Sequence, residues 1–395
     1  MATPEITGPE IANPEIANPE INGATAPGFG AVKDAFAKNF AERGDVGACV
    51  CVYRHGEPVV DLWGGRADAS TGAPWQRDTI VTVFSMTKGV TAVVMNLLVE
   101  RGLLDPDRTV ATYWPEFAAH GKEAITVEQV LSHRAGLPRI DDPLTRAEAL
   151  AWDPVIRAIE RQAPVWEPGT QHGYHMRSYG WIAGELVRRV TGRTLGTFLR
   201  EEIAEPLGID FHVGLDAAHE PRVARLIPPG SDHRAAMENL PDDLLLASVV
   251  SGPSGHFHYD EMWNTRELRA IELPSSSGVG NARAVAKLYA HLLGDGVDGR
   301  RLLAAETVAR ASTPLARGPD AVIFIETAFG LGFMLPPAAP TPVGPRSFGH
   351  GGAGGSTSWA DPDAGIAASY AMNAMRFDLD DGRAEAIARA VYRSL

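Results

Sequence analysis

The run Val81-Thr82-Val83-Phe84-Ser85-Met86-Thr87-Lys88 joins a strand-like pattern directly to a helical one. Residues 78–84 are rich in β-branched and aromatic side chains, which favour a strand. From Ser85 to about Gly102 the pattern is helical, and its apolar side chains fall on one stripe: Val90, Val93, Val94, Leu97 and Leu98. We therefore expect a long helix that opens at Ser85, directly after a strand.

Ser85 and Lys88 are the candidate nucleophile and the amine that activates it. Side chains three residues apart lie on one face of a helix, and a serine hydroxyl is a weak nucleophile unless a base contacts it. A buried lysine can act as that base, because burial disfavours its ammonium form. The amino end of the helix also offers N–H groups to a developing oxyanion. The alternative is a helix-capping serine beside a solvated lysine, since S-x-x-K is common by chance.

Strand patterns lie towards both ends of the chain, and helical patterns lie between them. This order predicts an α+β fold, in which an antiparallel sheet formed by both chain ends is flanked by helices and carries an all-helical inserted domain. We expect residues 27–120 and 275–395 to form the α/β domain and residues 121–274 the helical insertion. Residues 1–26 carry PEIAN repeats with proline at every fifth position, which predicts a disordered tail.

The composition restricts the partners and the location that we expect. The formal net charge is −13, and no Lys/Arg cluster would track phosphates, so we expect no nucleic-acid partner. No apolar run approaches the ~20 residues that span a bilayer, and we expect no membrane partner. The first residues show no secretory signal, which favours a cytoplasmic protein unless a signal was removed before the numbering begins. Cys49 and Cys51 lie in an apolar run and are expected to be reduced and structural.

Three further segments follow Ser85 in order, and together with S-x-x-K they form a set of four motifs. They are Leu131-Ser132-His133-Arg134-Ala135-Gly136-Leu137-Pro138, then Trp166-Glu167-Pro168-Gly169-Thr170 with Gly173-Tyr174-His175, and finally Gly349-His350-Gly351-Gly352-Ala353-Gly354-Gly355-Ser356. From about residue 29 onwards the chain resembles the penicillin-binding protein and class C β-lactamase superfamily, and most closely its esterase branch, the family VIII carboxylesterases. The resemblance implies a site in the groove between an α/β domain and a helical insertion.

The resemblance also implies roles for individual residues. Ser85 matches the nucleophile and Lys88 the lysine of the motif, while Tyr174 matches the tyrosine that is the general base together with Lys88. A phenol needs a neighbouring ammonium to lower its pKa before it can act as a base. The resemblance makes the backbone N–H groups of Ser85 and Ala353 the oxyanion hole. His350, Gly351 and Gly352 take the place of the substrate-binding K-T-G strand.

Two departures from the β-lactamase pattern favour an uncharged ester as the substrate. Met176 stands where an asparagine would bind a substrate carbonyl, and His350 replaces the lysine that meets the β-lactam carboxylate. A histidine is neutral for much of the time at pH 7. The sequence therefore predicts a serine carboxylesterase for short- to medium-chain small-molecule esters, with weak or no β-lactamase activity and no cofactor. It does not indicate the oligomeric state.

Other functions stay open at this point. The chain could be a β-lactamase or D-alanyl peptidase, or an inactive superfamily member that only binds, although Ser85, Lys88 and Tyr174 are all retained. An α/β-hydrolase would need a G-x-S-x-G motif, which we do not find in the sequence. His256 and His258 could share one face of a strand, but no third ligand is spaced to support a metal, and we expect no metal site.

Overall fold

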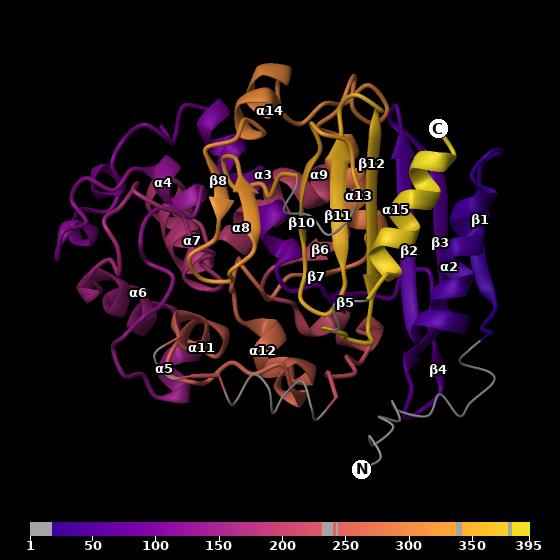
Figure 1. Ribbon diagram of the computed structural model, residues 1–395, viewed down its shortest axis with the longest axis horizontal. Coiled ribbons are helices and arrows are strands. Elements are labelled where there is room, and N and C mark those ends of the chain that lie inside the picture. Colours follow the sequence, from indigo (N-terminus) through magenta and orange to yellow (C-terminus); the bar gives the residue numbers. More distant parts are fainter. Residues whose placement is uncertain (1–17, 231–239, 242–243, 337–341, 378–380) are drawn as a thin grey trace, which may run out of the picture.

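An antiparallel sheet with its covering helices forms one side of the molecule, and a mainly helical region forms the other (Figure 1). The computed structural model describes residues 18–230, 240–241, 244–336, 342–377 and 381–395. The strand order is β1-β3-β2-β12-β11-β10, so strands from both chain ends lie side by side, and the predicted fold class is confirmed. The strands are β1 (Ile21–Thr25), β2 (Gly47–Arg54), β3 (Glu57–Asp68), β10 (Phe348–Gly351), β11 (Thr357–Asp361) and β12 (Ile366–Met372), with β4 (Ala73–Pro74) paired to β3.

Helices cover both faces of the sheet. On one face α2 (Gly30–Arg43) and the closing helix α15 (Arg383–Arg393) pack over a core that contains Trp359 and Tyr370. On the other face lie α13 (Ala282–Ala290) and α3 (Met86–Glu100). Every residue of α3 from Met86 to Leu98 is buried, because this helix lies between the sheet and the helical region. The expected helix at Ser85 is thus present, and it is enclosed on all sides.

The region between the two sheet halves is mostly helical, but it is not purely so. Its helices are α4 (Val127–Leu131), α5 (Arg146–Leu150), α6 (Trp152–Arg161), α7 (Ser178–Thr191), α8 (Leu195–Leu199), α9 (Glu205–Leu207), α11 (Leu245–Val250) and α12 (Arg266–Ala270), and short η turns lie among them, for example η5 (Glu261–Asn264). This region contributes one strand, β6 (Phe211–His212), which pairs with β7 (Val279–Gly280) beyond the region, and β7 in turn pairs with β5 (Val81–Thr82) before it. The prediction of an all-helical insertion is therefore wrong at β6. Gly280 makes this pairing possible, since an added Cβ would lie 2.5 Å from the Phe211 ring.

The remaining elements follow the inserted region. Helix α14 (Ala305–Ala311) leads to a hairpin of β8 (Ala316–Pro319) and β9 (Glu326–Phe329). The domain boundaries at residues 120 and 274 stay a prediction. Cys49 and Cys51 are free and buried, as expected, and burial raises the pKa of the Cys49 thiol to about 11.

The disordered tail was predicted to reach residue 26, and this is wrong for its last part. Strand β1 pairs with β3 through five residues, from Ile21 with Gly64 to Thr25 with Val60. The proline spacing that excludes regular structure ends at Pro19, and no proline follows until Pro27. The free edge of β3 is thereby covered, which removes unpaired backbone groups from solvent. Residues 1–17 lie outside the described residues.

Candidate active site

Ser85 lies at the amino end of α3, where the chain turns sharply out of the preceding strand. Phe84 has a φ of 47°, a left-handed conformation that is costly for a bulky residue. Aromatic contacts hold its ring in place, with edge-on partners Tyr259 at 5.5 Å and Trp263 at 4.9 Å between ring centroids. The strained turn presents Ser85, 9% exposed, at the helix terminus. A strained residue that its surroundings hold in place is typical of functional sites.

The amine of Lys88 has three polar partners. Its Nζ atom lies 3.2 Å from Oγ of Ser85, 2.6 Å from the carbonyl oxygen of Met176 and 3.1 Å from that of Ser275. Carbonyl oxygens only accept hydrogen bonds. A neutral amine would therefore direct its two N–H groups at the carbonyls and its lone pair at the Ser85 hydroxyl.

The surroundings of Lys88 favour that neutral form. Lys88 is completely buried, and burial first, then the nearby Arg177 guanidinium, lowers its pKa well below the ordinary value. Arg177 is itself buried and donates to the carbonyls of Val249 and Val250 at the end of α11. Its positive charge is thus held close to the amine by the backbone of the helical region.

Tyr174 lies directly beside this pair. The Lys88 Nζ atom is 4.7 Å from the centroid of the Tyr174 ring. Burial raises the pKa of the Tyr174 phenol, and a hydrogen bond with Ser85 acts in the other direction. A role as base needs a lowered pKa, and this shift has the opposite direction. The role of Tyr174 as general base together with Lys88 stays a prediction.

Two groups that the sequence did not single out hold the backbone of the Tyr174 segment. The carboxylate of Asp320, in the turn after β8, accepts the N–H of Tyr174 at 3.0 Å. Nδ1 of His133 accepts the N–H of His175 at 3.1 Å. Both side chains are buried. His133 belongs to the second motif, so this motif helps to position the segment that carries Tyr174.

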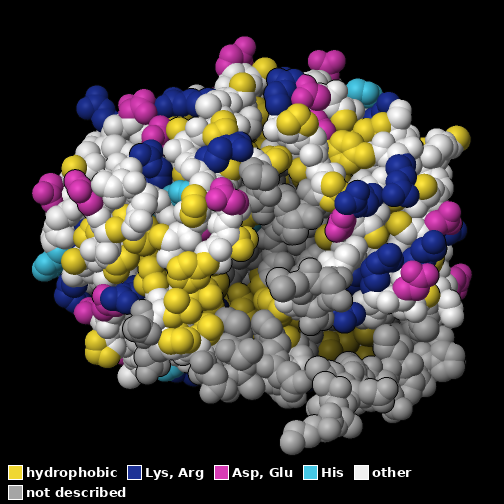
Figure 2. Space-filling model, in the orientation of Figure 1, with side chains coloured by type: hydrophobic (Ala, Val, Ile, Leu, Met, Phe, Trp, Pro, Cys, Tyr) yellow, Lys and Arg dark blue, Asp and Glu magenta, His cyan; other side chains and the backbone are white. Residues whose placement is uncertain are grey.

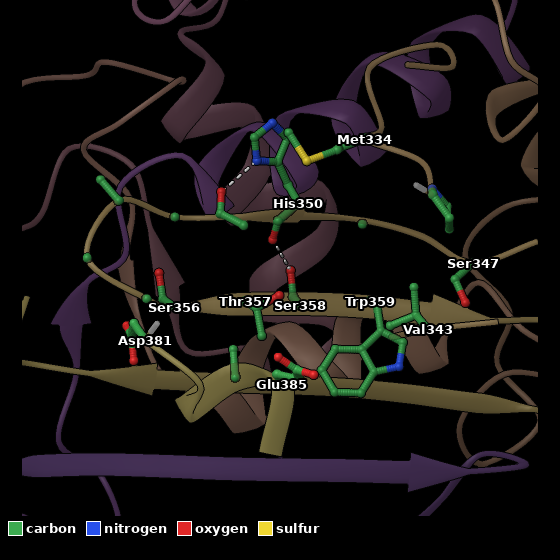
Figure 3. A pocket seen from close by; sticks show the side chains of 18 of the residues that line it. Met334, Val343, Ser347, His350, Ser356, Thr357, Ser358, Trp359, Asp381 and Glu385 are labelled. Carbon is green, nitrogen blue, oxygen red and sulfur yellow. Dashed lines mark hydrogen bonds between the residues drawn. The ribbon is translucent and has the colours of Figure 1, made fainter. Parts of the chain in front are cut away.

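The glycine-rich segment packs against the residues that precede Ser85. An added Cβ on Gly352 would lie 2.2 Å from the carbonyl oxygen of Val83, and Ser356 Oγ donates to that same oxygen at 3.2 Å. Only glycine allows this approach. The structure therefore brings Gly352 and Ala353 next to the Ser85 turn. A pocket of about 450 Å³ opens along β10 and is lined by the glycine-rich segment together with Asp381 and Glu385 (Figure 3), but Ser85, Lys88 and Tyr174 are not among its lining residues.

A buried ion pair between Arg383 and Asp45 holds the glycine-rich segment in place. Arg383, at the start of α15, donates to the carbonyl oxygen of Gly354 at 2.8 Å and to Oδ1 of Asp45 at 2.9 Å. Tyr370 donates to the other oxygen of Asp45 at 2.5 Å. Arg383, Asp45 and Tyr370 are all fully buried. A buried charge that is paired and hydrogen-bonded in this way is costly to break, so the carbonyl next to Ala353 has a fixed position.

His350 stands on the face of β10 away from Trp359 (Figure 3). Its Nδ1 lies 2.6 Å from the carbonyl oxygen of Gly351, so Nδ1 carries the proton. Burial and the nearby Lys88 lower the pKa of His350 to about 3. His350 is therefore neutral at pH 7, as the sequence suggested, and it provides no fixed cation for a carboxylate.

Met176 and Tyr259 form an apolar wall at the site. The carbonyl of Met176 holds Lys88, while its sulfur accepts a long contact of 3.7 Å from the Tyr259 hydroxyl. The Tyr259 ring contacts both Phe84 and Phe377, at 5.5 and 5.1 Å between ring centroids. Tyr259 is a residue of the site that the sequence did not indicate.

The two histidines at 256 and 258 each bond a backbone carbonyl, of Leu144 and Gly255 respectively. Within the described residues no group of three or more His, Cys, Asp or Glu side chains could hold a metal ion. In the same part of the chain, no helix combines the length and the apolar character needed to cross a membrane.

Comparison with known proteins places this chain in a family. The beta-lactamase family model matches residues 34–392. The chain belongs to the beta-lactamase family. Among its relatives is the esterase/beta-lactamase LipL of Mycobacterium tuberculosis, which is 35% identical over 89% of this chain and 82% of LipL.

Solved structures give the same assignment for this beta-lactamase family member. A family VIII carboxylesterase is 38% identical, with a TM-score of 0.87, and covers 95% of this chain and 100% of its own. A penicillin-binding protein homologue from Caulobacter crescentus is 37% identical, with a TM-score of 0.86 and the same coverage. The predicted resemblance is confirmed.

Proposed function

We propose that the protein is a serine carboxylesterase in which Ser85 carries the acyl group and Lys88 is the base. The observation that carries this assignment is the set of three partners of the Lys88 amine. Two are carbonyls that take its N–H groups, and the third is the Ser85 hydroxyl at 3.2 Å. A base within hydrogen-bonding reach of the proton it removes meets the geometric requirement for general base catalysis. The names of LipL and of the family VIII carboxylesterase support ester hydrolysis.

Acylation would begin when Lys88 takes the proton of Ser85 and Oγ attacks the ester carbonyl carbon. The oxyanion would be held by the backbone N–H groups of Ser85 and Ala353. When the tetrahedral intermediate collapses, the C–O bond to the alcohol breaks. The alkoxide takes the proton of the Tyr174 phenol, and Tyr174 recovers a proton from the Lys88 ammonium. Water would then release the acid by the same steps in reverse, which returns Ser85, Lys88 and Tyr174 to their first states.

The lowered pKa of Lys88 supports its role as the base. Burial keeps the Tyr174 phenol protonated, and although a raised pKa makes it a weaker acid, it can still donate to an alkoxide, which is a stronger base than a phenolate. A buried lysine with a lowered pKa is a suitable base near neutral pH. The two groups are adjacent, so one proton can pass from Ser85 through Lys88 and Tyr174 to the leaving alcohol.

We propose that uncharged esters are preferred to β-lactams. His350 and Met176 occupy the two positions where a β-lactamase would bind the carboxylate and the side-chain amide. His350 is neutral, and the Met176 side chain offers only a weakly accepting sulfur. A β-lactamase or D-alanyl peptidase remains the second candidate, because a penicillin-binding protein homologue is nearly as similar as the carboxylesterase.

Labelling with a fluorophosphonate tests the nucleophile, and Ser85→Ala serves as the matched control. Mass spectrometry should find the adduct on the peptide that contains Ser85, and the Ser85→Ala variant should lack both the adduct and the hydrolysis of p-nitrophenyl butyrate. An adduct on another serine, with esterase activity retained in Ser85→Ala, would contradict the assignment. Absence of any adduct and of any ester hydrolysis would favour an inactive binding protein.

A further inference from the structure

An exposed apolar surface adjoins the candidate site. Among the described residues four large hydrophobic side chains are exposed, and two of them are consecutive: Phe324 at 58% and Ile325 at 56%. Both lie in the turn between β8 and β9. Figure 2 shows hydrophobic side chains gathered over this turn and α11, left of centre. We name this surface the turn patch, and it consists of Phe324 and Ile325 with the half-buried Trp166, Leu245, Leu246 and Ile323.

The turn patch is continuous with the candidate site. Its half-buried members pack on one cluster, whose buried members include Tyr174 and Val322 and against which Met176 also packs. One oxygen of Asp320 accepts the N–H groups of Tyr174, at 3.0 Å, and of Val322, at 2.9 Å. The turn and the Tyr174 segment are therefore bound to the same carboxylate, and Ile323 of the turn and Met176 pack against the same apolar cluster.

Close packing fixes the position of the turn relative to the Tyr174 segment. Gly173 lies between Val322 and Trp166, and an added Cβ would be 2.8 Å from one side chain and 2.9 Å from the other. Phe324 has a φ of 57°, a strained conformation for a bulky residue. An exposed phenylalanine held in a strained turn beside a site indicates that its ring serves something other than the core.

We infer that the turn patch binds the alkyl chain of the acyl group of the substrate, extending from Ser85 past Met176. The inference rests on the proposed carboxylesterase function and specifies its substrate: an ester whose acyl chain is long enough to leave the catalytic centre. Apolar surface next to a site favours an apolar ligand. The net charge of −13 opposes contact with an anionic lipid surface, so the occupant is the chain of a single substrate molecule and not a bilayer.

The test compares two p-nitrophenyl esters, acetate and octanoate, below the concentration at which octanoate forms micelles. The variant is Phe324→Ser with Ile325→Ser. The matched control is Leu103→Ser, which removes another exposed large hydrophobic side chain, 43% exposed, just beyond the end of α3. Each methylene that loses its apolar contact lowers affinity about fourfold. The octanoate-to-acetate ratio of kcat/KM should fall at least fivefold in the variant and stay unchanged in the control.

The outcomes separate this inference from the proposed function. If the unaltered protein hydrolyses neither ester, the proposed function fails. If it hydrolyses both and the ratio is the same in the variant, only the turn patch assignment fails. The assignment would also fail if the variant changed the sedimentation of the protein or its binding to phosphatidylglycerol vesicles without a change in the ratio. The occupant would then be a second copy of the chain or a membrane.

Discussion

Removing Lys88 and Tyr174 singly and together tests whether the two side chains act as one proton-transfer unit. The variants are Lys88→Met, which keeps an unbranched chain but no amine, and Tyr174→Phe, which removes only the hydroxyl. General acid–base groups contribute about 10²–10⁴ in rate, or roughly 2.7–5.5 kcal/mol. If the two acted independently, the double variant would lose about 10⁴–10⁸. The 3.2 Å contact with Ser85 and the adjacent phenol predict instead that it loses little more than the more severe single variant.

Stability has to be followed in the same series. Without the Lys88 amine, the carbonyls of Met176 and Ser275 lose a donor, which costs about 1–3 kcal/mol for each group left unsatisfied. The loss of a buried polar amine offsets part of that cost. The melting temperature of each variant is therefore measured first. For variants that remain folded, kcat/KM is then measured with a simple alkyl ester such as ethyl butyrate. Multiplicative losses in folded variants would refute the shared proton path.

Three further predictions concern pH, substrate preference and the amino-terminal segment. Because the neutral amine of Lys88 is the active form and its pKa is lowered, kcat/KM for an ester should rise with pH and level off well below pH 10, and a decrease between pH 6 and 8 would contradict this. The same lowered pKa means that unfolded chains bind more protons at this group, so its contribution to stability also increases with pH. With His350 neutral, kcat/KM should be higher for p-nitrophenyl butyrate than for nitrocefin, and the reverse order would contradict the esterase assignment. Deleting residues 2–17 should leave the melting temperature unchanged, whereas deleting residues 2–25 should lower it, because β1 covers the edge of β3; equal effects would show that β1 adds no stability.

The sequence predicted the elements whose signal is local. The strand that leads into Ser85 and the helix that follows it depend on patterns within about twenty residues. The order of the motifs then indicated the family, and with it the sheet built from both chain ends. The predicted site residues Lys88 and Tyr174 do lie together with Ser85, and their roles stay proposals.

The supporting groups could not be predicted, because their partners are distant in the sequence. Asp320 holds Tyr174 across 146 residues, and Arg383 pairs with Asp45 across 338. Neither carboxylate lies in a motif, and neither spacing has a local meaning. The prediction for β1 failed for a related reason. Its pairing depends on the free edge of β3, not on its own composition, and the proline repeat just before it suggested disorder.

A second buried lysine shows why Lys88 in particular can act as a base. Lys122 donates to three carbonyls, of Ala119, Glu160 and Gln162, at 2.8, 2.9 and 2.5 Å. These three carbonyls accept all three hydrogens of an ammonium group, so Lys122 has no lone pair with which to accept a proton. The Lys122 side chain instead links the backbone near residue 119 to that near residues 160–162.

The charges around the two amines also favour the neutral form at Lys88 more than at Lys122. Burial lowers the pKa of Lys122 to about 8, but the carboxylates of Glu160 and Glu123 oppose the shift. Among the described residues no carboxylate opposes the shift at Lys88, where the neighbouring charge is the Arg177 guanidinium and the third polar partner is a hydroxyl. With two carbonyl partners in place of three, and a neighbouring cation in place of carboxylates, a neutral Lys88 amine would have one lone pair free for the Ser85 hydroxyl. The chemistry proposed for this site follows from that difference, because the Lys122 amine has three carbonyl partners and no hydroxyl from which to accept a proton.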